Sequence, residues 1–155
     1  MFVINNKPTE YDFGGSRTRL LVPGEQTGGA WCMLEIFAPA GRSTPTHRHE
    51  REDETLMLLE GQLEVVVDGA PHRLKPGENV VLGRGTTHQF VNRGATTAHY
   101  LLICSPAGFD RFVAASSDAY DSTVAPVPPN DAAKTRMRAA AIEFGIDIVP
   151  PAEKN

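Results

Sequence analysis

Cysteine is scarce in this sequence, there is no excess of positive charge, and long apolar runs are missing. Two cysteines among 155 residues are too few for a disulfide framework, so we expect Cys32 and Cys104 to be buried free thiols. A balance of 15 basic against 19 acidic residues excludes a domain-wide basic surface for nucleic acid or anionic lipid. No run approaches the ~20 apolar residues that cross a bilayer, and the first residues lack the pattern of a secretory signal. We therefore predict a cytoplasmic protein that binds neither nucleic acid nor membrane.

Glycine and proline are plentiful, with 14 and 12 residues respectively. They separate short apolar runs, which is typical of an all-β barrel or sandwich. Within one run Leu63, Val65 and Val67 alternate with polar residues, so one face of that strand is expected to look inward. The expected strands are residues 20–22, 31–37, 54–59, 63–67, 72–74, 79–82, 88–92 and 98–104.

The last third of the chain has a helical pattern. We expect a short helix at 109–115 and a longer one at 131–144, with Asn130 or Asp131 as its N-terminal cap and Gly145 just past its end. The longer helix has a narrow apolar stripe. Two placements stay open: packing on the outside of the barrel or on a second subunit, or covering the barrel mouth as a lid.

Histidines are grouped in a way that favours metal binding. His47 and His49 are two residues apart, so in an extended chain both imidazoles point to the same side, roughly 6.6 Å apart. Glu54 opens the next apolar run, and His88 stands in a later one. Three imidazoles and one carboxylate suit a borderline first-row metal ion. On spacing alone, the charged stretch from Arg48 to Glu54 is more typical of a solvated turn than of a metal site.

The carboxylate of this set has two candidates. Asp53 and Glu54 are neighbours, but Glu54 shares the strand parity of Leu56 and Leu58 and so points with them toward the interior. A buried carboxylate is costly unless it is paired or bound to metal. This favours Glu54 as the ligand.

The histidine segment resembles the first signature of the cupin superfamily. That signature is a glycine, five residues, His-x-His, three or four residues, Glu, six residues and a glycine. Gly41, His47, His49, Glu54 and Gly61 occupy its places.

A second stretch resembles the other cupin signature. Gly77, Gly85, His88 and Asn92 fit it, whereas Gly83 stands where the family usually has proline. Glycine can make the same bend, but less rigidly.

The resemblance implies the following expectations. The fold is all-β, a cupin double-stranded β-helix (jelly-roll) barrel with a short C-terminal helical tail. The chain is a single cupin domain, 1–155, with a core barrel at about 20–106 and a helical extension at about 107–155. His47, His49, Glu54 and His88 hold one divalent metal ion per chain, iron, nickel, manganese, copper or zinc. The chain forms a homodimer.

A narrower resemblance is to the quercetin-dioxygenase-like group of cupins. It rests on Glu25–Gly29, on Asp53-Glu54 ahead of Leu59–Gly61, and on Ser105–Phe112. It implies an enzyme that acts on a small aromatic or enolisable molecule with dioxygen, with Glu54 as the catalytic base. The alternatives are a non-redox cyclase or isomerase of polyketide or sugar/keto-acid type, and a non-catalytic cupin that binds metal or a small molecule.

Strand parity also predicts the walls of a substrate pocket. On the strand at 31–37 two alternatives stay open. Either Met33 and Glu35 face inward, which makes Glu35 a second acid or base, or Leu34 and Ile36 do and Glu35 faces outward. The expected pocket residues are Met33, Glu35, Leu56, Leu58, Phe90, His99 and Leu101.

Overall fold

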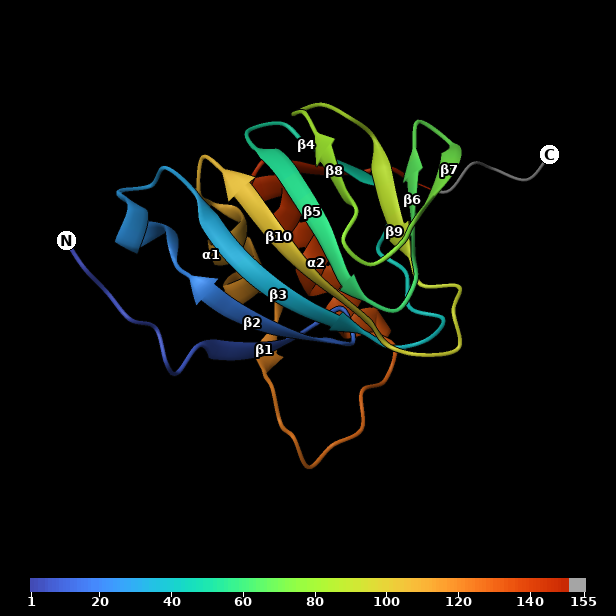
Figure 1. Cartoon of the computed structure of the whole chain (residues 1–155), viewed down its shortest axis with the longest axis horizontal. Coiled ribbons are helices and arrows are strands. Elements are labelled where there is room, and N and C mark those ends of the chain that lie inside the picture. Colours follow the sequence, from blue (N-terminus) through green and yellow to red (C-terminus); the bar gives the residue numbers. More distant parts are fainter. Residues whose placement is uncertain (151–155) are drawn as a thin grey trace.

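Two antiparallel β-sheets face each other in the computed structural model, which describes residues 1–150 (Figure 1). The larger sheet has the strand order β11-β1-β2-β3-β10-β5-β8, and the smaller has the order β12-β4-β9-β6-β7. Because sequential strands cross between the two sheets, the expected all-β jelly-roll is confirmed.

The larger sheet consists of β1 (Thr9–Phe13), β2 (Ser16–Val22), β3 (Cys32–Ala38), β5 (Asp53–Glu60), β8 (Asn79–Leu82), β10 (Ala98–Ser105) and β11 (Asp118–Ala119). The smaller sheet consists of β4 (His47–His49), β6 (Leu63–Val67), β7 (Ala70–Leu74), β9 (His88–Val91) and β12 (Ile146–Ile148). The helices are the 3₁₀ turn η1 (Gly24–Thr27), α1 (Phe109–Ser116) and α2 (Asp131–Glu143).

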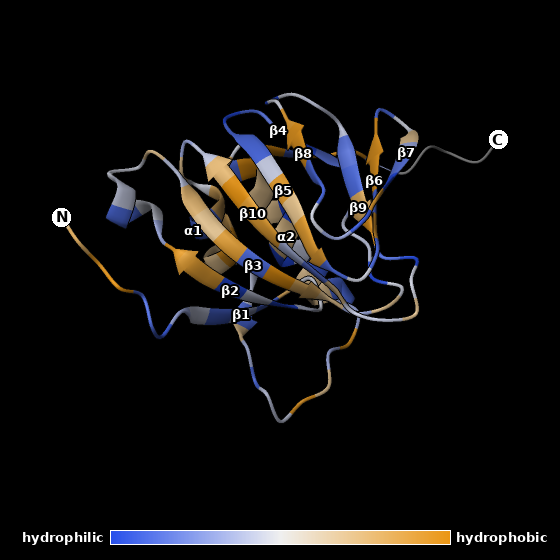
Figure 2. Cartoon of the chain, in the orientation of Figure 1, coloured by the Kyte–Doolittle hydropathy of each residue, from blue (hydrophilic) through white to orange (hydrophobic). Residues whose placement is uncertain are grey.

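The core lies between the two sheets. Strands β3, β5 and β10 alternate buried and exposed residues, and Figure 2 shows that hydrophobic residues dominate them. Leu34, Leu56 and Leu102 are adjacent across the three strands and at most 2% exposed. Each such side chain stabilises the fold by roughly 1.5–3 kcal/mol relative to an exposed one.

All eight strands expected from the sequence are present, within a few residues of their ends. Four strands were missed. β1 has only two apolar residues, Tyr11 and Phe13, and β4, β11 and β12 are two or three residues long, so all four are too short or too polar for a reliable strand pattern.

The C-terminal segment belongs to the barrel. The Asn130 side chain caps α2 by accepting a hydrogen bond from the backbone N–H of Ala133, and Gly145 follows the helix with φ +68°. The chain then forms β12, which pairs along the whole of β4. The tail therefore braces the strand that carries His47 and His49. None of the helices among residues 1–150 has the length and apolar character needed to cross a membrane.

Candidate metal centre

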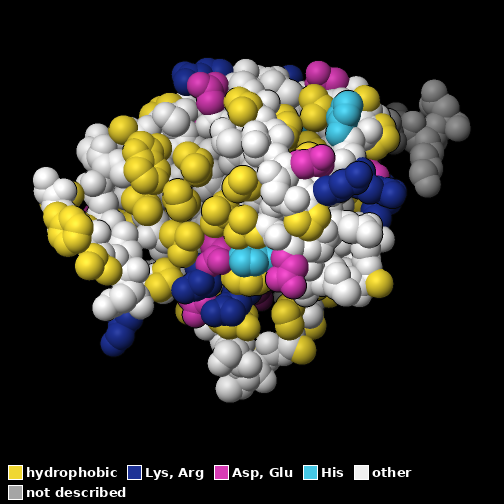
Figure 3. All heavy atoms as spheres, in the orientation of Figure 1, with side chains coloured by type: hydrophobic (Ala, Val, Ile, Leu, Met, Phe, Trp, Pro, Cys, Tyr) yellow, Lys and Arg dark blue, Asp and Glu magenta, His cyan; other side chains and the backbone are white. Residues whose placement is uncertain are grey.

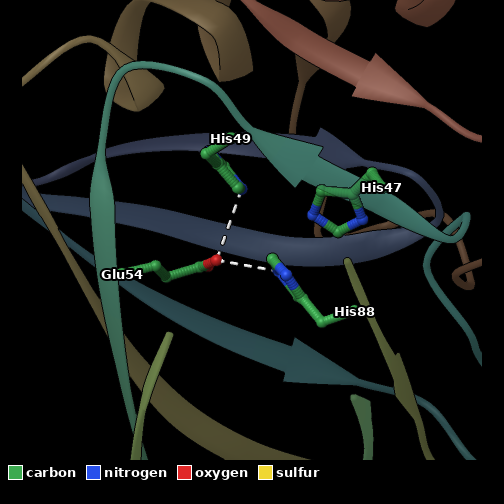
Figure 4. Close-up of side chains that lie close together, drawn as sticks. All are labelled: His47, His49, Glu54 and His88. Atoms are coloured by element: carbon green, nitrogen blue, oxygen red, sulfur yellow. Dashed lines mark ion pairs between the residues drawn. The ribbon is translucent and has the colours of Figure 1, made fainter. Parts of the chain in front are cut away.

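Four side chains from three strands converge between the sheets (Figure 4). His47 and His49 come from β4, Glu54 from β5 and His88 from β9. One ligand atom from each lies within 4.8 Å of the others, and all four residues are buried. A shared ion at ~2.0–2.2 Å from each atom needs donor pairs at most about 4.4 Å apart, so a slight contraction completes the set.

Two of the imidazoles have a backbone acceptor at the second ring nitrogen, and the third has a carboxylate nearby but no hydrogen bond there. His47 Nδ1 lies 2.7 Å from the Pro45 carbonyl oxygen, and His88 Nδ1 lies 2.9 Å from that of Thr86. His49 Nδ1 lies 3.4 Å from Glu52 Oε2. Such partners fix the tautomer and leave the opposite nitrogen with its lone pair toward a metal.

The inward-facing polar atoms lack hydrogen-bond partners among the described residues. His49 Nε2, His88 Nε2 and Glu54 Oε2 are all buried without one. Glu54 Oε2 lies 3.3 Å from His49 Nε2 and 3.0 Å from His88 Nε2, the two ion pairs drawn in Figure 4. Since unsatisfied buried polar groups are costly, this cluster fits a divalent ion that all four residues would bind.

The four ligands also shift one another's protonation. Burial, together with His88 and His49, lowers the pKa of His47 to about 4. Burial opposes ionisation of Glu54, but the surrounding imidazoles outweigh it and leave the pKa of Glu54 lowered. Burial likewise lowers the pKa of His49, but the Glu52 and Glu54 carboxylates outweigh it and leave that pKa raised. At neutral pH the site thus offers a carboxylate and a neutral His47.

A cavity of about 840 Å³ opens from the cluster on the side of His47 and Glu54. Its walls combine aromatic and aliphatic side chains from both sheets and both α-helices. The apolar lining residues include Phe13, Ile36, Phe90, Tyr100, Leu102, Phe109, Phe112, Met137, Ala141, Ile146 and Ile148. The second helix, α2, packs against α1 and β12, and its residues also line this cavity.

The alternation along the strand predicted that Glu54, rather than its neighbour Asp53, points inward, and the structure agrees. Glu54 is 1% exposed and lies in the cluster. Asp53 points to solvent and pairs with Arg84, whose Nη2 lies 3.1 Å from Asp53 Oδ2.

The expected pocket walls need correction. On β3 the inward residues are Leu34 and Ile36, so Met33 and Glu35 lie on the outer face of the larger sheet. His99 and Leu101 lie on that face as well, because β10 pairs with β3 in register. Figure 3 shows hydrophobic side chains gathered over the strands of this face, with histidine and charged side chains beside them.

The outer-face histidine has a partner of its own. His99 Nε2 lies 2.7 Å from Glu35 Oε1, away from the metal cluster. Of the other expected pocket residues, Phe90 lines the cavity, whereas Leu56 and Leu58 are fully buried in the core between the sheets.

Glu52 is the residue of the site that the sequence reasoning missed. It is 2% exposed and contacts His49 from the loop between β4 and β5. In the sequence it is one of several charges in a row, and β-strand parity does not apply to a loop. The available signal was its position three residues after a ligand histidine.

Acidification is expected to release a bound divalent ion. A raised pKa means that His49 holds a proton to higher pH than an ordinary histidine, so protons compete with metal at this position more strongly than at an ordinary histidine. His47, with a pKa of about 4, adds a second proton only in stronger acid. The Kd for Zn²⁺, measured by chelator competition from pH 8 to 5, should rise by about tenfold per pH unit once His49 is protonated. Full occupancy well below the ordinary histidine range would contradict this.

The fold is thus a double-sheet jelly-roll barrel in which three histidines and one glutamate form a buried candidate metal centre beside a cavity. Residues 33–104 match the family model of the cupin domain. This region, a little under half of the chain, is therefore a cupin domain, as the two signatures within it predicted.

The relatives that this chain resembles have names that describe different activities. The tetracenomycin polyketide synthase protein TcmJ of Streptomyces glaucescens is 34% identical over 60% of this chain and 62% of its own. Quercetin 2,3-dioxygenase of Bacillus subtilis is 26% identical over 75% of this chain and 34% of its own. A crystal structure from Silicibacter pomeroyi, described as a cupin sugar phosphate isomerase, is 28% identical with a TM-score of 0.54 over 61% of each chain. The chain thus spans less than two thirds of the length of each.

Proposed function

We propose that this protein is a metal-dependent enzyme that acts on a flat, aromatic, enolisable small molecule. The observation that carries the proposal is the position of the cluster. His47 and Glu54 border an apolar cavity of about 840 Å³, while His49 and His88 are shielded behind them. A ligand in the cavity therefore meets the metal-binding residues on one side only.

The cavity walls favour an aromatic substrate. Phe90, Phe109 and Phe112 present rings to the interior, and aromatic groups pack well against one another in offset or edge-on arrangements. The walls also carry polar side chains, among them Ser43, Thr44 and Gln89, so the aromatic rings rather than an absence of polar groups carry this preference. The similarity to a polyketide synthase protein and to a quercetin dioxygenase supports the same substrate class.

We assign a different chemical role to the metal ion, to Glu54, to Tyr100 and to the apolar walls of the cavity. A bound divalent ion supplies Lewis acidity, which lowers the pKa of an enol or phenol oxygen. Glu54, whose lowered pKa keeps it ionised at neutral pH, accepts the released proton. Burial raises the pKa of Tyr100, so this residue of the cavity wall stays a neutral phenol. The apolar walls exclude water from the reacting group.

Oxidation by dioxygen is the reaction we favour, with iron, nickel, manganese or copper at the site. The similarity to quercetin 2,3-dioxygenase covers 75% of this chain, which supports it. The second candidate is a non-redox cyclisation or isomerisation with zinc. It is favoured by the higher identity, 34%, to the tetracenomycin polyketide synthase protein.

One experiment separates the two reactions. The protein is purified without added metal, its ions are identified by mass spectrometry, and oxygen uptake is followed with a flavonol substrate. We expect a redox-active ion and oxygen uptake that the Glu54→Gln variant reduces by about 10²-fold or more, the lower end of general-base contributions. Zinc without oxygen uptake would overturn the dioxygenase and favour the second candidate. If neither the protein with a redox-active ion nor the protein with zinc converts any aromatic or enolic compound, the proposal of an enzyme is wrong.

Three expectations stay predictions: the homodimer, the cytoplasmic location and the organisation as one domain over 1–155. The last five residues of that range lie outside the described part of the chain.

A further inference from the structure

The cavity carries positive charge that the metal chemistry does not use. Arg42, from the loop between β3 and β4, lines it together with Lys134 and Arg138 of α2. The two α2 residues are four positions apart and so lie one above the other on the same helix face. The carboxylates in the lining are Glu54, which belongs to the metal cluster, and Asp147.

These three cations lack acidic partners among residues 1–150. No ion pair or side-chain hydrogen bond joins Arg42, Lys134 or Arg138 to a described carboxylate, whereas Asp147 already pairs with Arg48 at 2.6 Å. In addition, Arg42 Nε is buried and has no hydrogen-bond partner in the described structure. A buried guanidinium N–H without a hydrogen-bond acceptor destabilises the protein, and a ligand in the cavity that supplies the acceptor would remove this cost.

The cavity lining away from the metal cluster is positively charged, although the chain as a whole is negatively charged. The protein has a net charge of −4, yet the cavity lining away from the metal cluster holds three cations and one already paired carboxylate. A cleft with one sign of charge and low-dielectric walls concentrates ligands of the opposite sign. An apolar cavity of this kind fits a molecule with an aromatic body and an anionic end.

We infer that the substrate is an aromatic carboxylic acid whose carboxylate is held by Arg42, with Lys134 and Arg138 contributing from α2. This rests on the proposed function, because it assigns the enol or phenol end of the same molecule to the metal side of the cavity. A guanidinium is matched in shape to a carboxylate and can donate two parallel hydrogen bonds to it. Arg42 is thus a residue that determines substrate specificity.

The test compares 6-hydroxy-2-naphthoic acid with its methyl ester, which keeps the ring and the hydroxyl but removes the negative charge. Binding is followed by fluorescence titration of zinc-loaded and metal-free protein. We expect the acid to bind about 10–100-fold more tightly than the ester in both forms, as a charge-assisted contact would provide. The preference should shrink with added salt, because the α2 cations are exposed.

Variants show whether the named residues cause the preference. Arg42→Gln should weaken binding of the acid by about tenfold or more and leave the ester unchanged. Lys134→Gln and Arg138→Gln should each have smaller effects of the same kind. Arg93→Gln is the matched control, since Arg93 is an exposed cation outside the cavity, paired with Glu64.

Equal binding of acid and ester, or an Arg42→Gln variant that weakens both alike, would overturn the inference. These titrations need no turnover, so a failure of this inference can be distinguished from a failure of the proposed function. A protein that prefers the acid but neither retains metal nor converts any compound would disprove the enzyme and leave the anion site in place.

Discussion

Replacing His49 by alanine is expected to remove the metal from the purified protein. His49 is 2% exposed and is one of four ligands whose atoms lie within 4.8 Å of one another. Outer-shell partners of a metal are worth ~10–100-fold in affinity, so the loss of a direct ligand should cost at least about 100-fold. Metal content measured by mass spectrometry should fall from about one ion per chain to below about a tenth of that, together with any metal-dependent activity.

The histidine control is His72→Ala. His72 lies on β7, is exposed, and is outside the cluster, so its replacement should leave metal content unchanged. His49→Ala also leaves the buried Glu52 without its imidazole partner and is therefore expected to unfold at lower temperature. His88→Ala separates the two effects, because the Nδ1 partner of His88 is a backbone carbonyl. Unchanged metal in both His49→Ala and His88→Ala would refute the ligand assignment.

The ligand set was predictable because its geometry is local. Alternation along a strand puts His47 and His49 on one side, and the same rule separates Glu54 from Asp53. Only His88 needed information from far along the chain, and the second signature provided it. β4 and β9 then place His47 and His88 directly opposite each other.

The pocket was harder to predict because both faces of β3 carry apolar residues. Met33 and Phe37 alternate with Leu34 and Ile36, so periodicity does not say which set is inside. The pairing of Leu34 with Leu102 on β10, and of Leu102 with Leu56 on β5, decides it. The outer face stays partly apolar, with Met57 38% and Val81 68% exposed.

The cavity itself depends on contacts between distant parts of the chain. β12 adds to β4 across about a hundred residues, and α2 then supplies Met137 and Ala141 to the wall. The sequence predicted the helix and its cap, since both are local. Its direction relative to the barrel depends on β12, whose three residues are too few for a strand pattern to be recognised.

The glycine that ends the first signature is expected to be essential for folding. Gly61 joins β5 to β6 with φ +84°, and a Cβ placed on it would lie 2.6 Å from the Thr97 carbonyl oxygen and 3.1 Å from Ala98 Cα. The left-handed conformation alone costs a non-glycine residue roughly 1–2 kcal/mol. Relieving the backbone clash should add roughly 1–3 kcal/mol, as overpacking does elsewhere. Gly61→Ala is therefore expected to lower the free energy of unfolding by about 2–5 kcal/mol.

Gly69 provides a control with the same backbone conformation. It also has φ +84°, in the turn between β6 and β7, but a Cβ there would meet nothing within 4 Å. Gly69→Ala should thus show the conformational cost alone, about 1–2 kcal/mol. Urea unfolding in excess chelator gives both values without a contribution from metal binding. Equal losses in the two variants would mean that the approach of Thr97 is not what requires glycine at position 61, whereas a larger loss at Gly61 assigns the difference to that contact.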